Sequence, residues 1–477
     1  MRHPLADSDL LSARLLLAAV GVALLMVPAV SRAAPAESVD LLVAGGTVVT
    51  MDAGFRVVED GAVAVRGERI LAVGPVADLR VRFAPRKTID ATGHIVMPGL
   101  VNTHTHVPMT LLRGVADDVE LMVWLTKYIW PAENAHVTPE FVTWGTRLAA
   151  WEMIRTGTTT FADMYFYEDQ VAEATKEAGL RGYCAATVMD LPVPGLKNAD
   201  EGLRAAEAFL RKWSGDPLIV PAVGPHAVYT VGPETLLRAK ALAERHGAPL
   251  HIHAAESPSE MQMVKEKYGV GTVTHLDRIG FLGPNVTLAH AIWLSDEEIE
   301  LVARKGVGTA HCPSSNTKLA SGVSPVPKMR KAGVRAGLGT DGPASNNDLN
   351  LFEEIDLALK LHKITTGDPA VLTAKDGVEM ATIGGARALH LEKEIGSLEP
   401  GKRADLIVVA TDSPSALPLY DVYSHLAYAL KGTDVVTTVV NGRVLMEGRA
   451  MLTIDTARVA AKAREYRERI AAGLHAR

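Results

Sequence analysis

The chain has 477 residues, of which 48% are hydrophobic, and its formal net charge is −6 at pH 7. This length allows one barrel-sized domain and a smaller one with ample cores. The sequence has no basic tract and no run of aromatic side chains on which bases could stack, so no nucleic-acid partner is expected. Its two cysteines, Cys184 and Cys312, lie in apolar runs and are expected to be buried free thiols.

Residues 1–33 have the features of an export signal. Arg2 and Arg14 precede an apolar run at 15–30, and residues 31–33 (Ser-Arg-Ala) match a small-x-small cleavage site. The run is shorter than the roughly 20 residues that span a bilayer. We therefore expect a signal peptide cleaved after Ala33 and a periplasmic or secreted protein without stable membrane association, with an uncleaved anchor as the alternative.

Both ends of the remaining chain are rich in expected strands. Short apolar or alternating runs occur at 39–51, 61–66, 69–73, 404–409, 435–440 and 442–445. We expect residues 34–98 and 391–455 to form one small β-sandwich from both chain ends. Ala, Arg and Glu at helical spacing predict a surface helix over 456–477.

The middle, residues 99–390, alternates apolar strand runs with helical stretches. The expected strands are the run that leads into His104 and residues 158–164, 181–189, 218–224, 250–254, 286–289, 307–310 and 334–338. Eight such units close a barrel. The predicted fold is therefore α/β, a (β/α)8 TIM-type barrel carrying the sandwich.

Residues with metal-binding side chains follow several of these strands. His104 and His106 alternate along one strand and point the same way, so together they can hold a first-row metal. One such pair is a weak signal. Later strand runs, however, end in His226, His253 with Glu256, His290 and Asp341. A metal site at the mouth of a barrel requires such a set.

These motifs resemble the amidohydrolase superfamily, in particular its deaminase and chlorohydrolase branch, from about residue 39 to about residue 453. The matching segments are 98–106 (PGLVNTHTH), 109–114 (MTLLRG), 253–256 (HAAE), 288–290 (LAH), 311–316 (HCPSSN) and 339–347 (GTDGPASNN). Within this branch the chain is most similar to deaminases of 5-methylthioadenosine and S-adenosylhomocysteine.

The resemblance implies a catalytic site with one divalent metal. Its ligands would be His104, His106, His253 and Asp341, with a position left for water. Binuclear members use a lysine on strand four, and residues 218–226 contain none. Zinc is the first choice, and iron(II) or manganese(II) fits similar ligands. Asp341 would also accept a proton; the alternative is a turn aspartate before Gly342.

Two further residues are expected to take part in the chemistry. Glu256 would protonate a ring nitrogen of the substrate as general acid, and its alternative is an acid that stabilises a helix N-terminus. His290 would orient the attacking water, and its alternative is a hydrogen-bonded core histidine.

Substrate contacts are assigned by the same resemblance. Glu133 matches a ribose-binding glutamate, or is an exposed loop charge. His226 matches a histidine on the purine and Ser345 a small polar residue beside the ring. Trp124 would wall the pocket, although a tryptophan in a helical apolar pattern is more often core.

One departure from the family bears on the substrate. Members that take S-adenosylhomocysteine hold its carboxylate with an arginine after strand three, whereas residues 185–188 contain none. Arg204 lies downstream, in a pattern typical of a solvated helix face. This favours a neutral adenosine-type substrate or another aminated heterocycle.

The predicted function is metal-dependent hydrolytic deamination of a small aminated N-heterocycle of the adenosine, 5-methylthioadenosine or S-adenosylhomocysteine type, with release of ammonia. One alternative is a triazine chloro- or aminohydrolase that uses the same site. Another is a non-catalytic binding protein on a barrel, against which Glu256, His290 and the complete ligand set argue. Homo-oligomerisation is left open.

Overall fold

The computed structural model describes residues 36–475, so the predicted signal peptide lies outside the described residues. Eight strands follow one another in chain order around one sheet, and every neighbouring pair is parallel. They are β6 (Leu100–Thr105), β7 (Thr158–Tyr165), β8 (Arg181–Val188), β9 (Ile219–Pro225), β10 (Leu250–Ala254), β11 (Val286–His290), β12 (Gly308–His311) and β13 (Arg335–Leu338). The predicted barrel is confirmed.

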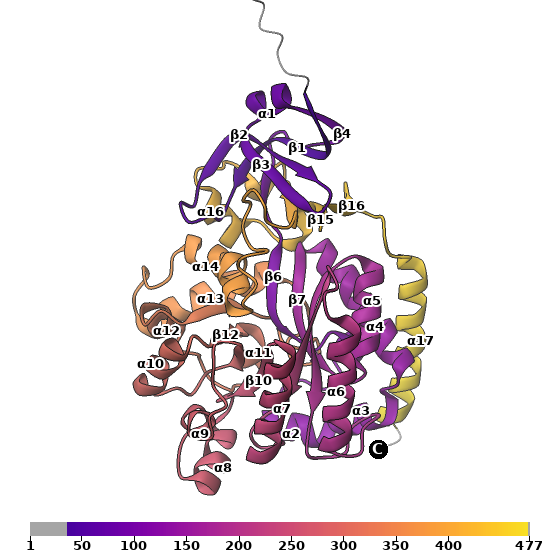
Figure 1. Ribbon diagram of the computed structural model, residues 1–477, viewed down its shortest axis with the longest axis vertical. Coiled ribbons are helices and arrows are strands. Elements are labelled where there is room, and N and C mark those ends of the chain that lie inside the picture. The colour runs from indigo at the N-terminus through magenta and orange to yellow at the C-terminus, as the bar shows by residue number, and fades with distance from the viewer. Residues whose placement is uncertain (1–35, 476–477) are drawn as a thin grey trace, which may run out of the picture. The chain divides into compact units, whose positions relative to one another are not determined.

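Helices cover the outside of these strands (Figure 1). Every residue of β7 and β8 is buried, so neither strand alternates between buried and exposed positions. The main helices of the barrel region are α3 (Trp130–His136), α4 (Pro139–Arg155), α5 (Glu168–Ala178), α6 (Ala199–Trp213), α7 (Pro233–His246), α8 (Pro258–Tyr268), α9 (Thr272–Arg278), α10 (Asp296–Lys305), α11 (Pro313–Lys318), α12 (Val326–Lys331), α13 (Leu351–Thr366), α14 (Ala374–Met380) and α15 (Ile383–Ala388).

The first and last strands, β6 and β13, meet at a seam formed largely by side chains. Asn102 Nδ2 donates to Thr340 Oγ1 at 2.8 Å, and Thr340 N donates to Asn102 Oδ1 at 3.0 Å. Three residues after the end of β13, Asp341 N donates to His104 O at 2.9 Å. The seam therefore brings Asp341 beside His104, although 236 residues separate the two in sequence.

The two chain ends form a second, mixed sheet of nine strands, ordered β17-β16-β15-β14-β5-β1-β2-β3 with β4 paired to β1. Its strands are β1 (Glu37–Val49), β2 (Val57–Arg66), β3 (Arg69–Pro75), β4 (Phe83–Asp90), β5 (Ile95–Pro98), β14 (Leu406–Val409), β15 (Val435–Val440), β16 (Arg443–Glu447) and β17 (Ala450–Met451). Figure 1 shows the N-terminal strands above the C-terminal ones. Leu41 and Val43 pack into one apolar cluster, and Leu42 and Ala44 into another on the opposite face. This arrangement confirms a small β-sandwich built from both chain ends.

A buried ion pair connects the sandwich to the barrel. Arg181, the first residue of β8, donates from Nε to Asp405 Oδ2 at 3.0 Å and from Nη2 to Asp405 Oδ1 at 3.2 Å. Asn441 N also donates to Asp405 Oδ1, at 2.7 Å.

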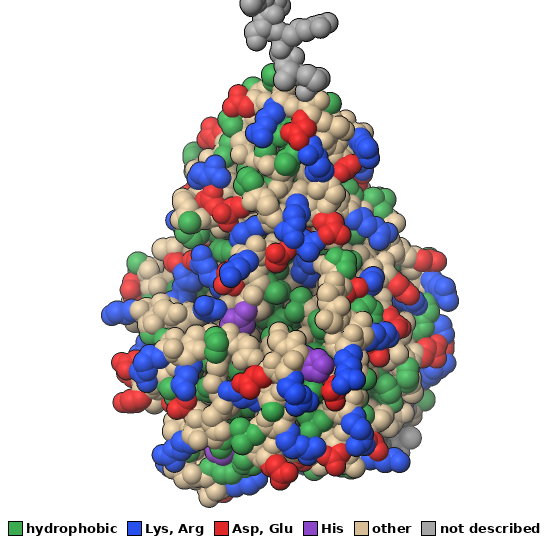
Figure 2. Space-filling view, in the orientation of Figure 1, with side chains coloured by type: hydrophobic (Ala, Val, Ile, Leu, Met, Phe, Trp, Pro, Cys, Tyr) green, Lys and Arg blue, Asp and Glu red, His purple; other side chains and the backbone are tan. Residues whose placement is uncertain are grey.

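The chain's last described element is helix α17 (Thr456–His475), where Tyr466 meets the ring of Phe141 on α4 edge-on. Figure 2 shows acidic and basic side chains interspersed over the viewed face of the molecule. No helix within the described residues is both long and apolar enough to cross a membrane.

Candidate active site

A cavity of about 630 Å³ opens where the barrel strands end. Its lining includes eight of the residues predicted from sequence, namely His106, Trp124, Glu133, His226, His253, Glu256, His290 and Asp341. The carboxyl ends of the strands are where barrel enzymes carry their active sites.

The four predicted metal ligands converge in space. Asp341 Oδ1 lies 3.4 Å from His104 Nε2 and 3.3 Å from His106 Nε2, and His253 Nε2 lies 3.3 Å from His106 Nε2. Ligands placed tetrahedrally at about 2.0–2.1 Å from a zinc ion lie about 3.3 Å from one another. The observed separations therefore suit one small divalent cation.

Hydrogen bonds on the far side of two rings support the same assignment. His106 Nδ1 donates to Met164 O at 2.6 Å, and His253 Nδ1 donates to His226 O at 2.8 Å. Because a carbonyl oxygen only accepts, each ring has a proton on Nδ1, which leaves Nε2 as the nitrogen that can bind a metal. His104 Nε2 is likewise buried, with no hydrogen bond to any described residue. A cation bound by all three Nε2 atoms would give each of them a partner.

Electrostatics keep these groups in their metal-binding forms. Burial lowers the pKa of His104 to about 4 and that of His253 well below its usual value, so both imidazoles are neutral at pH 7. Burial raises the pKa of Asp341, but His104, His290 and His106 together outweigh burial and hold this pKa well below the ordinary range. The site thus presents neutral nitrogens and one carboxylate, as a divalent metal requires.

Ser345 is placed differently from expectation. It does not line the cavity but is buried behind Asp341, where its Oγ donates to Asp341 Oδ2 at 3.0 Å. Ser315 Oγ donates to the same oxygen at 2.6 Å, and Gly342 N donates to Oδ1 at 2.7 Å. These three donors fix the orientation of the Asp341 carboxylate. An aspartate that only shaped a turn would not need its carboxylate to be held in this way.

Glu256 and His290 face each other across the cavity. Glu256 Oε1 lies 3.8 Å from His290 Nε2. Burial, followed by the charges of Asp341 and Glu260, raises the pKa of Glu256 well above its usual value. The role of helix N-terminal acid belongs instead to Glu260, whose carboxylate accepts from Ala255 N and Glu256 N.

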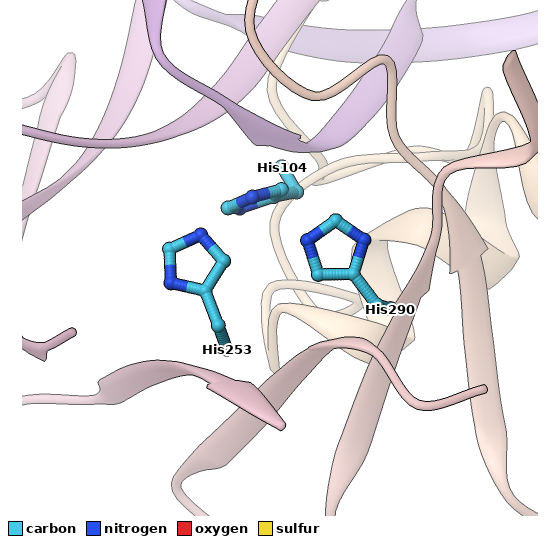
Figure 3. A group of neighbouring side chains, drawn as sticks. All are labelled: His104, His253 and His290. Atoms are coloured by element: carbon cyan, nitrogen blue, oxygen red, sulfur yellow. The ribbon is translucent and has the colours of Figure 1, made fainter. Parts of the chain in front are cut away.

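His290 is anchored on one side only. Its Nδ1 donates to Asn316 Oδ1 at 2.9 Å, which leaves Nε2 to face the cavity. Figure 3 shows its ring beside those of His104 and His253, and the ring centroids lie 5.3 and 5.5 Å away. A core histidine bonded at both nitrogens would not present a free lone pair to a ligand.

Glu133 is not an exposed loop charge. It lies in α3, is 4% exposed, and accepts a hydrogen bond from Tyr165 Oη at 2.7 Å. Burial raises its pKa to about 7, partly offset by the tyrosine. Trp124 is buried and also lines the cavity, so it contributes to both core and wall. His226 lines the cavity beside His253, with 4.7 Å between ring centroids.

Sequence reasoning missed three residues that support the site: Tyr165, Ser315 and His251. His104 Nδ1 lies 2.9 Å from His251 Nε2. His251 and His253 form a second His-x-His pair on one strand, so the alternation that identified His104 and His106 could have found it. Nothing in the local sequence signals the contacts of Tyr165 and Ser315, since their partners come from other elements.

Comparisons with known proteins identify related sequences. The model of the amidohydrolase family matches residues 95–445, and that of the bacterial imidazolonepropionase-like composite domain matches residues 61–84. The chain is 47% identical over 425 residues to the 5-methylthioadenosine/S-adenosylhomocysteine deaminase of Syntrophobacter fumaroxidans, with 89% of this chain and 97% of the relative covered. It is 45% identical over 439 residues to the 5'-deoxyadenosine deaminase of Methanosarcina acetivorans, with 92% and 100% covered.

A solved structure is similar over the same length. The crystal structure of an adenosine deaminase from Xanthomonas campestris with bound zinc superposes with a TM-score of 0.90 at 43% identity, covering 92% of this chain and all of that one.

Proposed function

Because the chain belongs to the amidohydrolase family, we propose that it is a metal-dependent hydrolase that removes the exocyclic amino group of an adenine-type nucleoside as ammonia. The observation that carries this proposal is the convergence of His104, His106, His253 and Asp341 beside a buried carboxyl group, Glu256, in one cavity. The names of the relatives support the choice of an adenine ring.

The three histidines and Asp341 would hold the metal, and zinc suits this donor set. When bound, such a metal supplies Lewis acidity that lowers the pKa of a coordinated water. The Nε2 atom of His290 accepts a hydrogen bond from the attacking water and orients it toward the ring carbon. Asp341, whose carboxylate is held in place by Ser315 and Ser345, takes up the proton of the water.

Glu256 acts as the general acid. Burial raises its pKa well above the usual value and so favours the protonated form, which can deliver a proton to a ring nitrogen while the water oxygen bonds to the neighbouring carbon. The proton held by Asp341 then passes to the amino group. As the carbon–nitrogen bond breaks and ammonia leaves, the added hydroxyl group gives its proton back to the Glu256 carboxylate, and the ring carbon is left with an oxo group.

A side arm of the cavity indicates which nucleosides fit. An adjoining hollow of about 400 Å³ shares Trp130, Glu133, Phe166 and Met189 with the main cavity. Its remaining lining consists of Asn134, Leu191, Pro192, Val193 and Pro194. If Glu133 binds the ribose hydroxyls, this arm receives the 5' substituent.

The side arm suits an uncharged substituent. Among the described residues that line it, none is Lys or Arg, and its one charged group is the carboxyl of Glu133. Arg204 is exposed on α6 and does not line it. A free carboxylate there would gain no ion pair, so we expect 5'-deoxyadenosine and 5-methylthioadenosine to be better substrates than S-adenosylhomocysteine.

An ammonia-release assay of the zinc-loaded protein tests the proposal. The panel comprises 5-methylthioadenosine, 5'-deoxyadenosine, adenosine, S-adenosylhomocysteine, adenine and a chlorotriazine, and the triazine is also assayed for chloride. Turnover of the first two with the highest kcat/KM is expected. If the triazine releases chloride and no nucleoside releases ammonia, the chain is a triazine hydrolase and not a deaminase. No turnover of any compound would favour a binding protein.

A further inference from the structure

We propose that His251 is a positioning residue that sets the tautomer and ring orientation of His104, so that His104 Nε2 presents its lone pair to the metal. This inference rests on the metal site proposed above. It begins from one contact, the 2.9 Å separation of His104 Nδ1 and His251 Nε2 between two buried rings.

The contact is a hydrogen bond in the plane of both rings and not a face-to-face stack. The ring planes differ by 10° and their centroids lie 5.0 Å apart. Parallel rings stacked face to face could not bring two nitrogens within 2.9 Å, whereas rings side by side reach this distance edge to edge. Such a bond restrains the rotation of His104 about its side-chain axis.

One nitrogen of this pair must donate and the other must accept. If His104 donates from Nδ1, its Nε2 is bare and can bind a metal. If His251 donates from Nε2 instead, neutral His104 carries its proton on Nε2 and cannot bind. The protonated nitrogen of His251 therefore decides whether His104 is a ligand.

His104 differs in this respect from the other two histidine ligands. His106 and His253 donate to the carbonyl oxygens of Met164 and His226, which accept and never donate. Their tautomers are fixed by backbone. That of His104 depends on a side chain, which a substitution can change.

The position of His251 in the fold suits this role. It lies two residues before His253 on β10, so one strand supplies both a ligand and the partner of a ligand from β6. The ring of Tyr183 also packs against His251, with 5.9 Å between the ring centroids. In the productive tautomer the proton of His251 is on Nδ1, a buried atom with no hydrogen-bond partner within residues 36–475. An unpartnered buried donor lowers stability, and we infer that it is retained for the sake of the metal site.

The test compares zinc dissociation constants by competition with a chromophoric chelator. In His251→Leu the acceptor is lost, and the constant should rise roughly 10–100-fold, as for other lost partners of metal-binding histidines. His251→Gln retains an acceptor oxygen and should stay within a few-fold of wild type. The matched control is His311→Leu, which removes a buried histidine of β12 paired with His362 at 3.3 Å and should leave zinc affinity unchanged.

Wild-type affinity in His251→Leu, or equal losses in the Leu and Gln variants, would overturn the proposal. If the variants do not fold, 15N NMR of the wild-type histidines decides, since His251 protonated on Nδ1 supports the inference and on Nε2 contradicts it. Failure of the wild-type protein to bind zinc would instead overturn the metal site itself.

Discussion

Glu256 and Glu133 both have buried carboxyl groups in one cavity, but their surroundings differ, and we expect Glu256 to donate a proton and Glu133 to bind ribose. No hydrogen bond within the described residues holds the Glu256 side chain, which leaves it free to deliver its proton to a substrate. In Glu256→Gln, zinc and substrate binding should persist while kcat falls by about two to four orders of magnitude, the usual span for a lost general acid. Steady-state kinetics and elemental analysis check this, and activity within a few-fold of wild type would make Glu256 a structural residue.

From the pKa of Glu133 we expect the preference for nucleosides over free bases to depend on pH. Its pKa of about 7 is raised by burial, so the carboxylate that accepts ribose hydroxyls is present above this pH and is lost as the pH falls through it. The KM for a nucleoside, divided by that for the matching base, should therefore rise toward acidic pH.

The Glu133→Gln variant is the control for this pH dependence, because its amide does not titrate. Its KM ratio should be flat with pH and higher than that of wild type above neutrality, since a hydrogen bond to a charged group contributes about 1.5–3 kcal/mol. Identical pH profiles in both proteins would remove Glu133 from ribose binding.

Strand β8 is tied to the terminal sheet by the ion pair of Arg181 with Asp405, whose side chains are 6% and 2% exposed. Asp405→Ala leaves a buried guanidinium without its counter-charge and should lower the free energy of unfolding by about 3–5 kcal/mol. The exposed pair of Arg211 with Glu207 provides the control, for which Glu207→Ala should cost less than about 1 kcal/mol. Chemical denaturation measures both variants. If Asp405→Ala and Glu207→Ala lower the free energy of unfolding equally, the buried pair does not stabilise the contact between β8 and the terminal sheet.

The extent to which these elements could be predicted follows from how local their signals are. The barrel strands were predictable because each is an apolar run, and His104, His106 and Asp341 because they stand where such runs end. Strands β4 and β5 escaped prediction, although β5 lies in the middle of the terminal sheet between β1 and β14. Strand β4 (FAPRKTID) mixes charged residues with a proline, and only Gly99 separates β5 from β6, so these two look like one run in the sequence.

The missed site contacts are long-range. Ser315 reaches Asp341 across 26 residues, Tyr165 reaches Glu133 across 32, and His251 reaches His104 across 147. Local pattern cannot reveal which inward side chains meet across a barrel. The burial of Glu133 also depends on how α3 packs, which its loop-like sequence did not indicate.

For the chain as a whole, we propose export with cleavage after Ala33. The basis is the apolar run at 15–30 and the Ser-Arg-Ala signal at 31–33. N-terminal sequencing of the protein from a periplasmic or secreted fraction should begin at Ala34. A chain that begins at Met1 and stays in the cytosolic fraction would contradict export, and one that begins at Met1 in the membrane fraction would indicate an uncleaved anchor.

The central claim is that one metal held by residues from β6, β10 and the end of β13 enables this chain to deaminate an adenine nucleoside. The most direct measurement determines metal content and ammonia release from 5-methylthioadenosine on the same samples of wild type and His253→Ala. The account predicts about one zinc per wild-type chain with turnover, and loss of both in the variant, because two histidines and a carboxylate retain the ion poorly. Full metal occupancy with wild-type activity in His253→Ala, or undiminished turnover by metal-free wild type, would contradict it.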